Sequence, residues 1–470
     1  MDERVLHRLE FNLVREQLAR LAETPLGREL AEKLVPVTDI QVVRERLLET
    51  AEARELVRLE PGFSAGGWHD LRVALQRALQ GGLLEAAELY LLGENLSVIR
   101  RVKAFFKERA RKYPVLGRLA GKLVTFPELE ERLKKALRAP GEVTEGASAR
   151  LAEIRRRIER LRAEIKETLD NFVRSAEWQK YLQEPLVTIR EERYVLPVRV
   201  EHRDKVKGLV HDQSSSGATL FIEPLSVVEK GNEIRRLKAA EQREIERILT
   251  DLTGAVAVVA RELLNATETL GRLDFALAKG RYSAYLDAVP PVLLPLPVVE
   301  LRQARHPLLG AKAVPIDVRL GRDFDVLIIT GPNTGGKTVA LKTVGLCVLM
   351  VQAGLEIPAA EGSEVGIFTR VFVDIGDEQS ITANLSTFSS HIHNIGAILK
   401  EADDHSLVLL DELGAGTDPR EGAVLACAVL EELAERGVRV IATTHSARSE
   451  EHTSELQSHV NLVCRLLLEK

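Results

Sequence analysis

Apolar side chains recur at helical spacing through the first quarter of the chain. From Val5 to about Leu34 the leucines follow one another every three to five residues, and similar patterns continue through Lys122. Such spacing places apolar side chains on one face of successive helices. The clearest loop among them is PGFSAGG, from Pro61 to Gly67, because it concentrates glycine, proline and serine. We therefore predict an all-helical core domain over residues 1–140.

Two longer and more charged helices are predicted next, within residues 141–289. From Ser148 to Phe172 the apolar residues alternate spacings of three and four, and Arg and Glu fill most other positions, which is a short heptad pattern. A second charged helix runs from about Val227 to Leu264. Because the two helices flank one insert, we predict an antiparallel pair of arms. The alternative is a solvated coiled coil whose basic residues touch no ligand.

The insert between the arms, about residues 185–225, has a different pattern. Leu186 to Val200 is rich in Val, Ile and Arg, and Gly208 to Pro224 reads GLVHDQSSSGATLFIEP. These stretches predict short β-strands, with Ser214 to Gly217 as a turn. Enough basic residues gather in this tip for phosphate contacts, whereas the alternative is a solvated basic hairpin. They are Arg190, Arg193, Arg199, Arg203, Lys205 and Lys207.

Prolines at positions 290, 291, 295 and 297 mark the start of a third predicted domain, residues 290–447. Short strands are predicted from Val298 to Leu327, and the apolar run from Val326 to Thr330 predicts a buried strand. This run leads into GPNTGGKT, which fits the GxxxxGKT phosphate-loop pattern at every fixed position. A helical pattern follows from Val339 to Val351.

The chemistry of phosphate binding explains the residue types in this loop. Glycines let backbone N–H groups curl around phosphates, Lys337 can reach the β- and γ-phosphates, and Thr338 can hold Mg²⁺. The N-terminus of the following helix also favours anions. ATP and Mg²⁺ are therefore the predicted ligands, and a plain glycine-rich turn is the alternative. The predicted nucleotide-binding residues of the loop are Gly331, Pro332, Asn333, Thr334, Gly335, Gly336, Lys337 and Thr338.

Two carboxylates follow a further apolar run downstream of the loop. Ser406 to Glu412 reads SLVLLDE, which predicts a buried strand ending in Asp411 and Glu412. Asp411 is the predicted Mg²⁺ ligand, acting through water, and Glu412 is placed to orient or deprotonate the water that attacks ATP. A strand followed by Asp-Glu is common, but its pairing with an upstream phosphate loop makes the interpretation specific.

Two other segments complete the candidate site. Val438 to His445 (VRVIATTH) is an apolar strand whose final histidine is a candidate γ-phosphate sensor, although a lone histidine at a strand end is usually structural. Asn384 to His393 (NLSTFSSHIH) reads as a capped helix start that can offer Ser386 and Thr387 to a phosphate.

Composition changes this picture little. The length of 470 residues exceeds one ordinary core, and the net charge of −5 argues neither for nor against nucleic acid. Cys347, Cys427 and Cys464 show no metal-ligand spacing and fit a reducing cytoplasm. No signal peptide opens the sequence and no apolar run is long enough to cross a bilayer, so we expect a cytoplasmic protein with no membrane partner.

Four motifs, TGPNTGGKT, NLSTFSSHI, LLDELGAGTDP and ATTH, together resemble the MutS family of DNA-binding ATPases, which is related to the ABC-type ATPases. The upstream ARHPLL, the helical core and the paired helices with an inserted tip are similar to that family's core, lever and clamp. LSTFSSHIHNI, GDEQSI and GLVHDQSSSGATLFIEP look most like the second bacterial branch, which is associated with recombination suppression and with collided ribosomes. The resemblance extends to about Ser446.

The resemblance implies a fold and a set of roles. The fold is multidomain: an all-helical core with long antiparallel helical arms and a small β-containing clamp tip, followed by an α/β ABC-type P-loop ATPase domain. The implied roles are catalysis by Lys337, Glu412 as base and His445 as switch histidine, with Mg²⁺ held by Thr338 and Asp411.

The resemblance also implies a homodimer. In such ATPases Ser386 and Thr387 are offered to the nucleotide of a second subunit, and the segment 416–418 (Gly-Thr-Asp) lies at that interface. Residues near Arg305, His306 and Pro307 are expected close to the adenine.

The implied function is an ATP-hydrolysing clamp on nucleic acid, with branched DNA as the first candidate partner. One alternative is an ATPase that binds rRNA and splits collided ribosomes. Another, from a different class, is a structural ABC-type tether, against which the short arms count. Mismatch recognition is not implied, because the mismatch-reading branch begins with a small mixed domain whereas this chain begins with the helical core.

The last residues form a separate problem. Arg448 to His459 (RSEEHTSELQSH) resembles one frame of a sequencing-library adapter, so we hypothesise that residues 448–470 are not native. The alternative is a polar linker and short helix. On this hypothesis the C-terminal nuclease domain of the branch is absent and endonuclease activity is not expected. Sequencing the locus again from adapter-free DNA tests the hypothesis.

Overall fold

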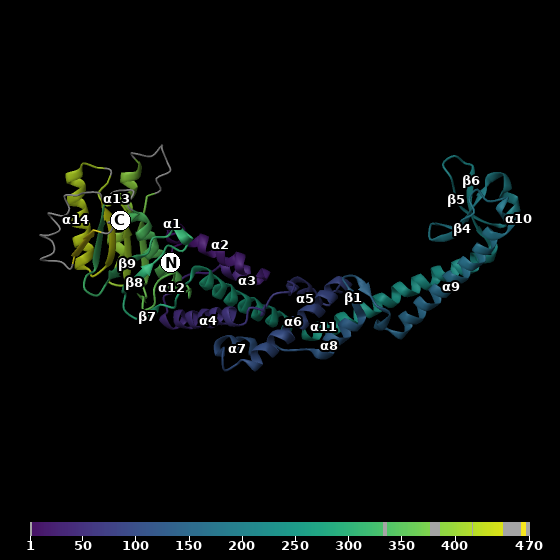
Figure 1. Cartoon of the computed structure of the whole chain (residues 1–470), viewed down its shortest axis with the longest axis horizontal. Coiled ribbons are helices and arrows are strands. Elements are labelled where there is room, and N and C mark those ends of the chain that lie inside the picture. The colour runs from purple at the N-terminus through teal and green to yellow at the C-terminus, as the bar shows by residue number, and fades with distance from the viewer. Residues whose placement is uncertain (1, 332–335, 377–385, 416, 445–461, 467–470) are drawn as a thin grey trace. The chain divides into compact units, whose positions relative to one another are not determined.

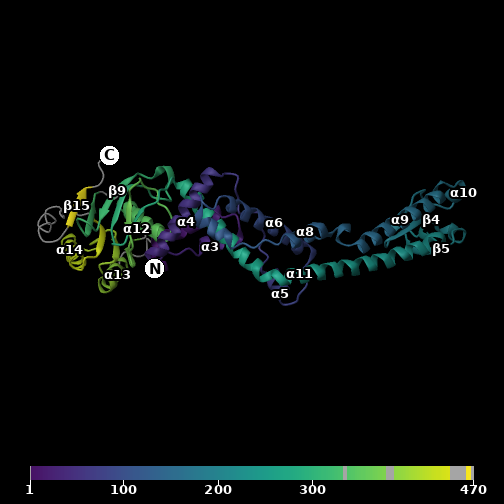
Figure 2. The same cartoon turned by 90° about the horizontal axis from the view of Figure 1, so that it is seen from below.

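The computed structural model describes residues 2–331, 336–376, 386–415, 417–444 and 462–466, with the backbone alone for residues 311, 386–390 and 462–466. The chain divides into two compact units, each assembled from several segments (Figures 1 and 2). We name them the sheet unit (Met1–Trp68, Val98–Leu123 and Ala266–Lys470) and the arm unit (His69–Ser97 and Val124–Asn265). Two helices contribute residues to both units: α6 (Ala86–Glu108) and α11 (Leu225–Leu286).

Five further helices from the first part of the chain belong to the sheet unit. Their ends carry the expected sequence signals. For example, Pro25 is the first residue of α3, and the Thr24 hydroxyl caps the helix by accepting the N–H of Gly27 at 3.0 Å. These helices are α1 (Glu3–Arg8), α2 (Phe11–Leu21), α3 (Pro25–Glu32), α4 (Ile40–Leu59) and α7 (Pro114–Gly121).

A five-stranded parallel sheet forms the centre of the sheet unit, in the order β12-β13-β14-β10-β15. Side chains alternate between its two faces, as they do in any strand. Leu327 and Ile329 of β10 share a core with α12, whereas Val326 and Ile328 share a core with α13 and α14. The result is a three-layer arrangement, visible in Figure 1. The elements are β10 (Val326–Thr330), α12 (Lys337–Gln352), β12 (Arg370–Asp374), α13 (Ser386–Glu401), β13 (Ser406–Leu410), α14 (Pro419–Glu435), β14 (Arg439–Thr444) and β15 (Leu462–Leu466).

The N-terminal helices and the parallel sheet share one hydrophobic core. Leu9 and Phe11 are fully buried in the same cluster as Leu341 of α12 and Leu409 of β13. A smaller sheet, in the order β7-β11-β8-β9, completes the sheet unit. Its strands are β7 (Val292–Leu294), β8 (Val299–Ala304), β9 (Ile316–Leu320) and β11 (Glu364–Gly366), with a 3₁₀ turn, η3 (Gly310–Lys312).

In the arm unit, α9 (Ala149–Arg174) runs antiparallel to the first part of α11. As residue numbers increase along α9, the residue numbers of their ion-pair partners on α11 decrease. The ion pairs are Arg155–Glu241 at 2.7 Å, Arg157–Glu233 at 3.1 Å and Lys230–Glu164 at 3.0 Å. Apolar residues at heptad spacing on α9, including Ile158, Leu161 and Ile165, pack with Ile234 of α11. The predicted antiparallel pair of helices is present, with the predicted apolar positions of α9 buried between them, although α11 extends beyond the predicted end at Leu264.

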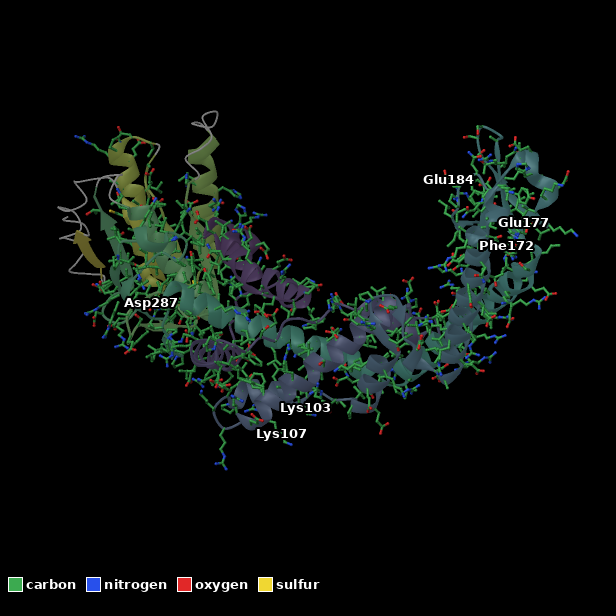
Figure 3. The ribbon with its side chains drawn as sticks, turned by 45° about the vertical axis from the view of Figure 1, so that its right-hand side comes forward. Lys103, Lys107, Phe172, Glu177, Glu184 and Asp287 are labelled. Atoms are coloured by element: carbon green, nitrogen blue, oxygen red, sulfur yellow. The ribbon has the colours of Figure 1, made fainter. Side chains whose placement is uncertain are left out.

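The arm unit also contains a four-stranded antiparallel sheet, in the order β3-β4-β6-β5. Leu196 and Ile222 are fully buried against the end of the arms. Figure 3 labels Phe172, Glu177 and Glu184 in this part of the unit, and the centroids of the Phe172 and Trp178 rings lie 4.4 Å apart. The strands are β3 (Thr188–Arg190), β4 (Arg193–Arg199), β5 (Gly208–Gln213) and β6 (Thr219–Pro224). The other elements of the unit are α5 (Arg72–Leu79), α8 (Pro127–Ala136), β1 (Leu137–Ala139), β2 (Glu142–Val143), η1 (Glu145–Ala147), α10 (Ala176–Gln179) and η2 (Val200–Lys205).

The structure also bears on the tail and on membrane association. The alternative interpretation of the tail expects a short helix, but residues Leu462–Leu466 form a strand that pairs with β10. Most of residues 448–470 lie outside the described part of the chain, so the hypothesis of a non-native tail stays a prediction. Within the described residues, no helix has both the length and the apolar content required to cross a membrane.

Candidate nucleotide site

The predicted phosphate loop connects β10 to α12. The strand has the bounds predicted from the apolar run, and α12 begins at Lys337, two residues before the predicted start. Gly336 precedes the helix in a left-handed conformation, with φ of 74°, which a residue without a side chain adopts at little cost. The N–H groups in the first turn of an α-helix point out of its N-terminus, away from the hydrogen-bonded turns that follow. N–H groups at a helix N-terminus can bind an anion.

Lys337 is folded into this corner of the sheet unit. The residue is 4% exposed, and its Nζ donates to the carbonyl oxygen of Gly331. Burial lowers the pKa of Lys337, and the nearby carboxylates of Glu412 and Asp411 oppose that shift. When a nucleotide binds, a lysine in this position can replace its hydrogen bond to the carbonyl oxygen by hydrogen bonds to negatively charged phosphate oxygens.

Thr338 and Asp411 meet across the gap between α12 and β13. The Thr338 hydroxyl donates to Asp411 Oδ2 at 2.7 Å, although the two residues lie 73 positions apart in the sequence. Asp411 directly follows the buried strand β13 and is itself 7% exposed. The sequence predicted both residues as Mg²⁺ ligands, and the structure brings them together.

Hard oxygen donors of this kind fit the predicted cation. A hydroxyl and a carboxylate beside a phosphate-binding turn are the ligand types that Mg²⁺ prefers, usually completed by water and by phosphate oxygens. Thr338 and Asp411 would therefore hold Mg²⁺, and the ion would supply charge neutralisation on the phosphate oxygens.

Glu412 has an unusual backbone. Its φ of 49° lies in the left-handed region, which costs a non-glycine residue about 1 kcal/mol or more. Its N–H donates to Thr443 Oγ1 at 2.8 Å, and the N–H of Leu413 donates to the Thr443 carbonyl at 3.0 Å. These contacts hold the turn that follows β13 in place and present two adjacent carboxylates at the end of the strand.

Thr443 was not predicted as a functional residue. It lies on β14 between β10 and β13 and is fully buried. Its hydroxyl donates to Asp411 Oδ1 while it accepts the Glu412 N–H. The only sequence signal was its position two residues before His445, at the end of a predicted strand.

A second group missed by sequence reasoning lies on the other side of Asp411. The carbonyl oxygen of Asp374 accepts the Asp411 N–H at 2.8 Å. The Asp374 carboxylate contacts His391 Nδ1 at 2.7 Å and accepts from Asn394 Nδ2 at 3.1 Å. Since His391 and Asn394 belong to α13, this carboxylate connects the strand beside the site to the helix that begins at Ser386.

Comparisons with known proteins agree with this geometry. A family model described as MutS domain V matches residues 327–467, which include all of β10 but its first residue, and the whole of α12, β13 and β14. The chain is 55% identical over 445 residues to Endonuclease MutS2 of Pelotomaculum thermopropionicum, and the match covers 95% of this chain and 57% of the relative. The corresponding values for the Symbiobacterium thermophilum protein of the same name are 51% identity over 95% of this chain and 56% of the relative. For the Acetivibrio thermocellus protein they are 46%, 100% and 60%.

The chain belongs to the MutS family. The resemblance drawn from the phosphate loop, the Asp-Glu pair and the strand before His445 is thereby confirmed. The chain spans 57% of the length of the Pelotomaculum relative.

Several predicted site residues of this MutS-family chain lie outside the described part of the structure. They are Pro332, Asn333, Thr334, Gly335, Gly416 and His445. Ser386 is described by its backbone alone, as the first residue of α13, which agrees with a helix start there. Their roles stay predictions.

The residues expected near the adenine belong to the sheet unit. His306 is 6% exposed, and its Nδ1 accepts the N–H of Leu308 at 3.3 Å. Burial lowers the pKa of His306; the negative charge of Glu10 opposes this shift, and the positive charge of Lys342 adds to it. Arg305 reaches Asp287 at 3.5 Å. A contact with adenine stays a prediction.

The predicted role of Arg193 as a phosphate contact is wrong. Its side chain is 8% exposed and forms a 3.1 Å ion pair with Glu223, which is 2% exposed. Asn232 of α11 accepts from Arg193 Nη2 at 2.7 Å, and His211 Nε2 lies 2.7 Å from the second Glu223 oxygen. Arg193 therefore connects the tip sheet to α11 inside the arm unit. Its positive charge is paired with a buried carboxylate and does not face solvent.

The other basic residues of the tip differ in how far they are exposed for contact with a ligand. Arg190 lies over the Phe221 ring at 4.4 Å and 3.4 Å from Asp212. Arg203 donates to the backbone carbonyls of Val206 and Gly208. The exposed members of the set are Arg199, Lys205 and Lys207.

Proposed function

We propose that this MutS-family chain binds and hydrolyses ATP and uses the nucleotide state to drive a clamp on nucleic acid. The contact between Thr338 and Asp411 at 2.7 Å carries the proposal, because it joins the end of the phosphate loop to the carboxylate that a phosphoryl-transfer site requires. Lys337 lies one residue before Thr338 and is already buried in the same corner. The parallel sheet with helices on both faces supports an ABC-type ATPase arrangement for residues 290–447.

Each residue has a part in the proposed mechanism. Lys337 and the first N–H groups of α12 bind the phosphates, while Thr338 and Asp411 hold the accompanying Mg²⁺. Glu412 orients the attacking water and accepts its proton. Ser386 and His445 complete the site as phosphate contacts, Ser386 from a second copy of the chain.

The proposed coupling to the arms rests on a homodimer. ATP held between two subunits adds contacts only when the halves close, and it can therefore shift an open–closed equilibrium by that difference in affinity. In this proposal residues 1–140 form the core, residues 141–289 form the arms, and the exposed basic residues of the tip contact phosphate groups of branched DNA. Nuclease activity, which appears in the names of the relatives, is not part of the proposal.

The test is ATP turnover by the purified chain alone, with branched DNA, with linear duplex and with ribosomes, beside a Lys337→Ala control. We expect turnover that depends on Lys337 and rises with branched DNA. A rise with ribosomes alone would replace DNA by the ribosome as the partner. Turnover that Lys337→Ala does not reduce, or no turnover under any condition, would refute the proposed ATPase.

A further inference from the structure

We propose that Thr443 is a positioning residue for ATP hydrolysis, acting through both carboxylates that follow β13. The inference rests on the proposed ATPase function and assigns a role to a residue outside the predicted nucleotide-binding and catalytic set. It begins from the place of Thr443 in the sheet. Parallel pairing sets Thr443 opposite Ile329 of β10 and one residue beyond the last pair of β13 with β14, Leu410 with Ala442.

This register brings one hydroxyl to two different polar groups. A threonine hydroxyl has one proton to donate and lone pairs that accept. In the structure it donates to Asp411 Oδ1 and accepts the Glu412 N–H at 2.8 Å. Because the side chain is fully buried, solvent does not compete for either bond.

The first bond orients Asp411. With Oδ1 occupied by Thr443, the other oxygen, Oδ2, is directed to the Thr338 hydroxyl at 2.7 Å. The carboxylate is thus held by one threonine on each side, and the oxygen on the Thr338 side is the one that can reach a cation beside the phosphates. Valine at position 443 would leave Oδ1 buried without this donor, which is unfavourable in the interior.

The second bond sets the direction of Glu412. The left-handed φ of 49° is unfavourable for glutamate on its own, so contacts around the residue have to maintain it. The N–H of Glu412 is held by the Thr443 hydroxyl, while the next N–H, that of Leu413, is held by the Thr443 backbone carbonyl at 3.0 Å. Only the first of these two bonds depends on the side chain of residue 443.

That difference provides a test that needs neither ATP nor Mg²⁺. Amide hydrogen exchange in the nucleotide-free chain should show faster exchange at Glu412 in Thr443→Val, by about 10-fold or more, with little change at Leu413. Thr443→Ser should keep both amides protected. Equal protection of Glu412 in Thr443→Val and the unchanged chain would overturn the proposal.

The kinetic test uses the same variants. Thr443→Val should lower kcat about 10- to 100-fold, raise the Mg²⁺ concentration needed for half-maximal turnover, and leave Mg²⁺-free nucleotide affinity within about 2-fold. Thr443→Ser should recover most of kcat although it packs less well. If Ser is as slow as Val, the methyl group and not the hydroxyl is responsible, and the proposal fails.

A matched control exists on α12. Thr343 is also buried, at 2% exposure, and donates only within its helix, to Val339 at 2.6 Å. Thr343→Val should leave the exchange of Glu412 and kcat unchanged. Should Thr443→Val fail to fold, Thr443→Ser and Thr443→Ala make the same comparison, since they differ only by the hydroxyl.

Failure of this inference is distinguishable from failure of the proposed function. If the unchanged chain shows no turnover that depends on Lys337, the ATPase proposal fails and the kinetic part of the inference fails with it. The exchange measurement still decides whether the Thr443 hydroxyl holds Glu412. If turnover depends on Lys337 but not on the hydroxyl of residue 443, only the inference is refuted.

Discussion

Replacing Arg193 by methionine should loosen the tip sheet of the arm unit without removing a nucleic-acid contact. Arg193 and Glu223 are 8% and 2% exposed, and their closest atoms are 3.1 Å apart. At that distance and an effective dielectric constant of about 20, the attraction is about 5 kcal/mol. Part of it is offset by the desolvation of both ions, so the more relevant figure is the loss of about 3–5 kcal/mol when one partner of a buried pair is removed.

The substitution removes the ion-pair partner of Glu223. In Arg193→Met its carboxylate stays buried with His211 as its remaining polar partner, at 2.7 Å. Since a small domain is stable by only about 5–15 kcal/mol, such a loss is large for a single unit. We expect amides of β4 and β6 to exchange about 10²- to 10⁴-fold faster, measured by hydrogen exchange on the intact chain.

Two further variants isolate the cause. Arg193→Met combined with Glu223→Leu removes both charges and should recover part of the lost protection. Arg199→Met, at the exposed end of β4, is the matched control and should leave exchange unchanged while weakening binding to branched DNA. Arg193→Met that exchanges like the unchanged chain yet binds nucleic acid more weakly would refute the reasoning, because Arg193 would then be a contact.

Three other predictions follow from individual contacts. Glu412→Gln should retain ATP binding and slow hydrolysis about 10²- to 10⁴-fold, and unchanged turnover in a steady-state assay would remove Glu412 from the mechanism. In the arm unit, Arg247 beside Glu244 lowers the pKa of Glu244 from 4.5 to about 2, with further help from Ser148 and Arg150; the resulting stability is present above pH 4.5 and is lost as the pH falls towards 2. Acid unfolding of the arm unit should therefore become less steep in Glu244→Gln, and an identical pH profile would contradict the assignment. On α11, an added Cβ at Gly280 would lie 2.5 Å from the backbone of Ala53, whereas Gly254 has open space around it, so Gly280→Ala should cost about 1–3 kcal/mol and Gly254→Ala should gain about 0.5–1 kcal/mol in thermal unfolding.

The sequence predicted those parts of the fold that depend on periodic burial. The heptad positions of α9 and the apolar run of β10 were recognisable because each buries a regular face against one neighbour. The phosphate loop was recognisable for a different reason, since the chemistry of phosphate binding restricts the residue type at fixed spacing. Both kinds of signal are local, and neither requires knowledge of which distant segments meet.

Arg193 and Thr443 could not be assigned in that way. Whether an arginine faces solvent or a buried carboxylate depends on a partner that lies 30 residues away in the sequence, Glu223. Thr443 contacts Asp411 only because β14 lies directly beside β13, although 32 residues separate the two side chains. Threonine is common in strands, so its residue type alone carries no sign of a special role.

Thr443 lies two residues before the predicted γ-phosphate sensor, His445, and accepts the N–H of the predicted base, Glu412. The strand whose hydroxyl holds Asp411 and Glu412 ends at Thr444, immediately before the predicted sensor His445. A displacement of β14 by a phosphate at its end would therefore move the group that supports both carboxylates. Conversely, a change in the turn after β13 would be transmitted to β14 through the two hydrogen bonds that the N–H groups of Glu412 and Leu413 donate to Thr443. If His445 does sense the γ-phosphate, the sensor directly follows, in sequence, the strand that is hydrogen-bonded to the predicted base, so mutations at Thr443 and His445 should show non-additive effects on turnover.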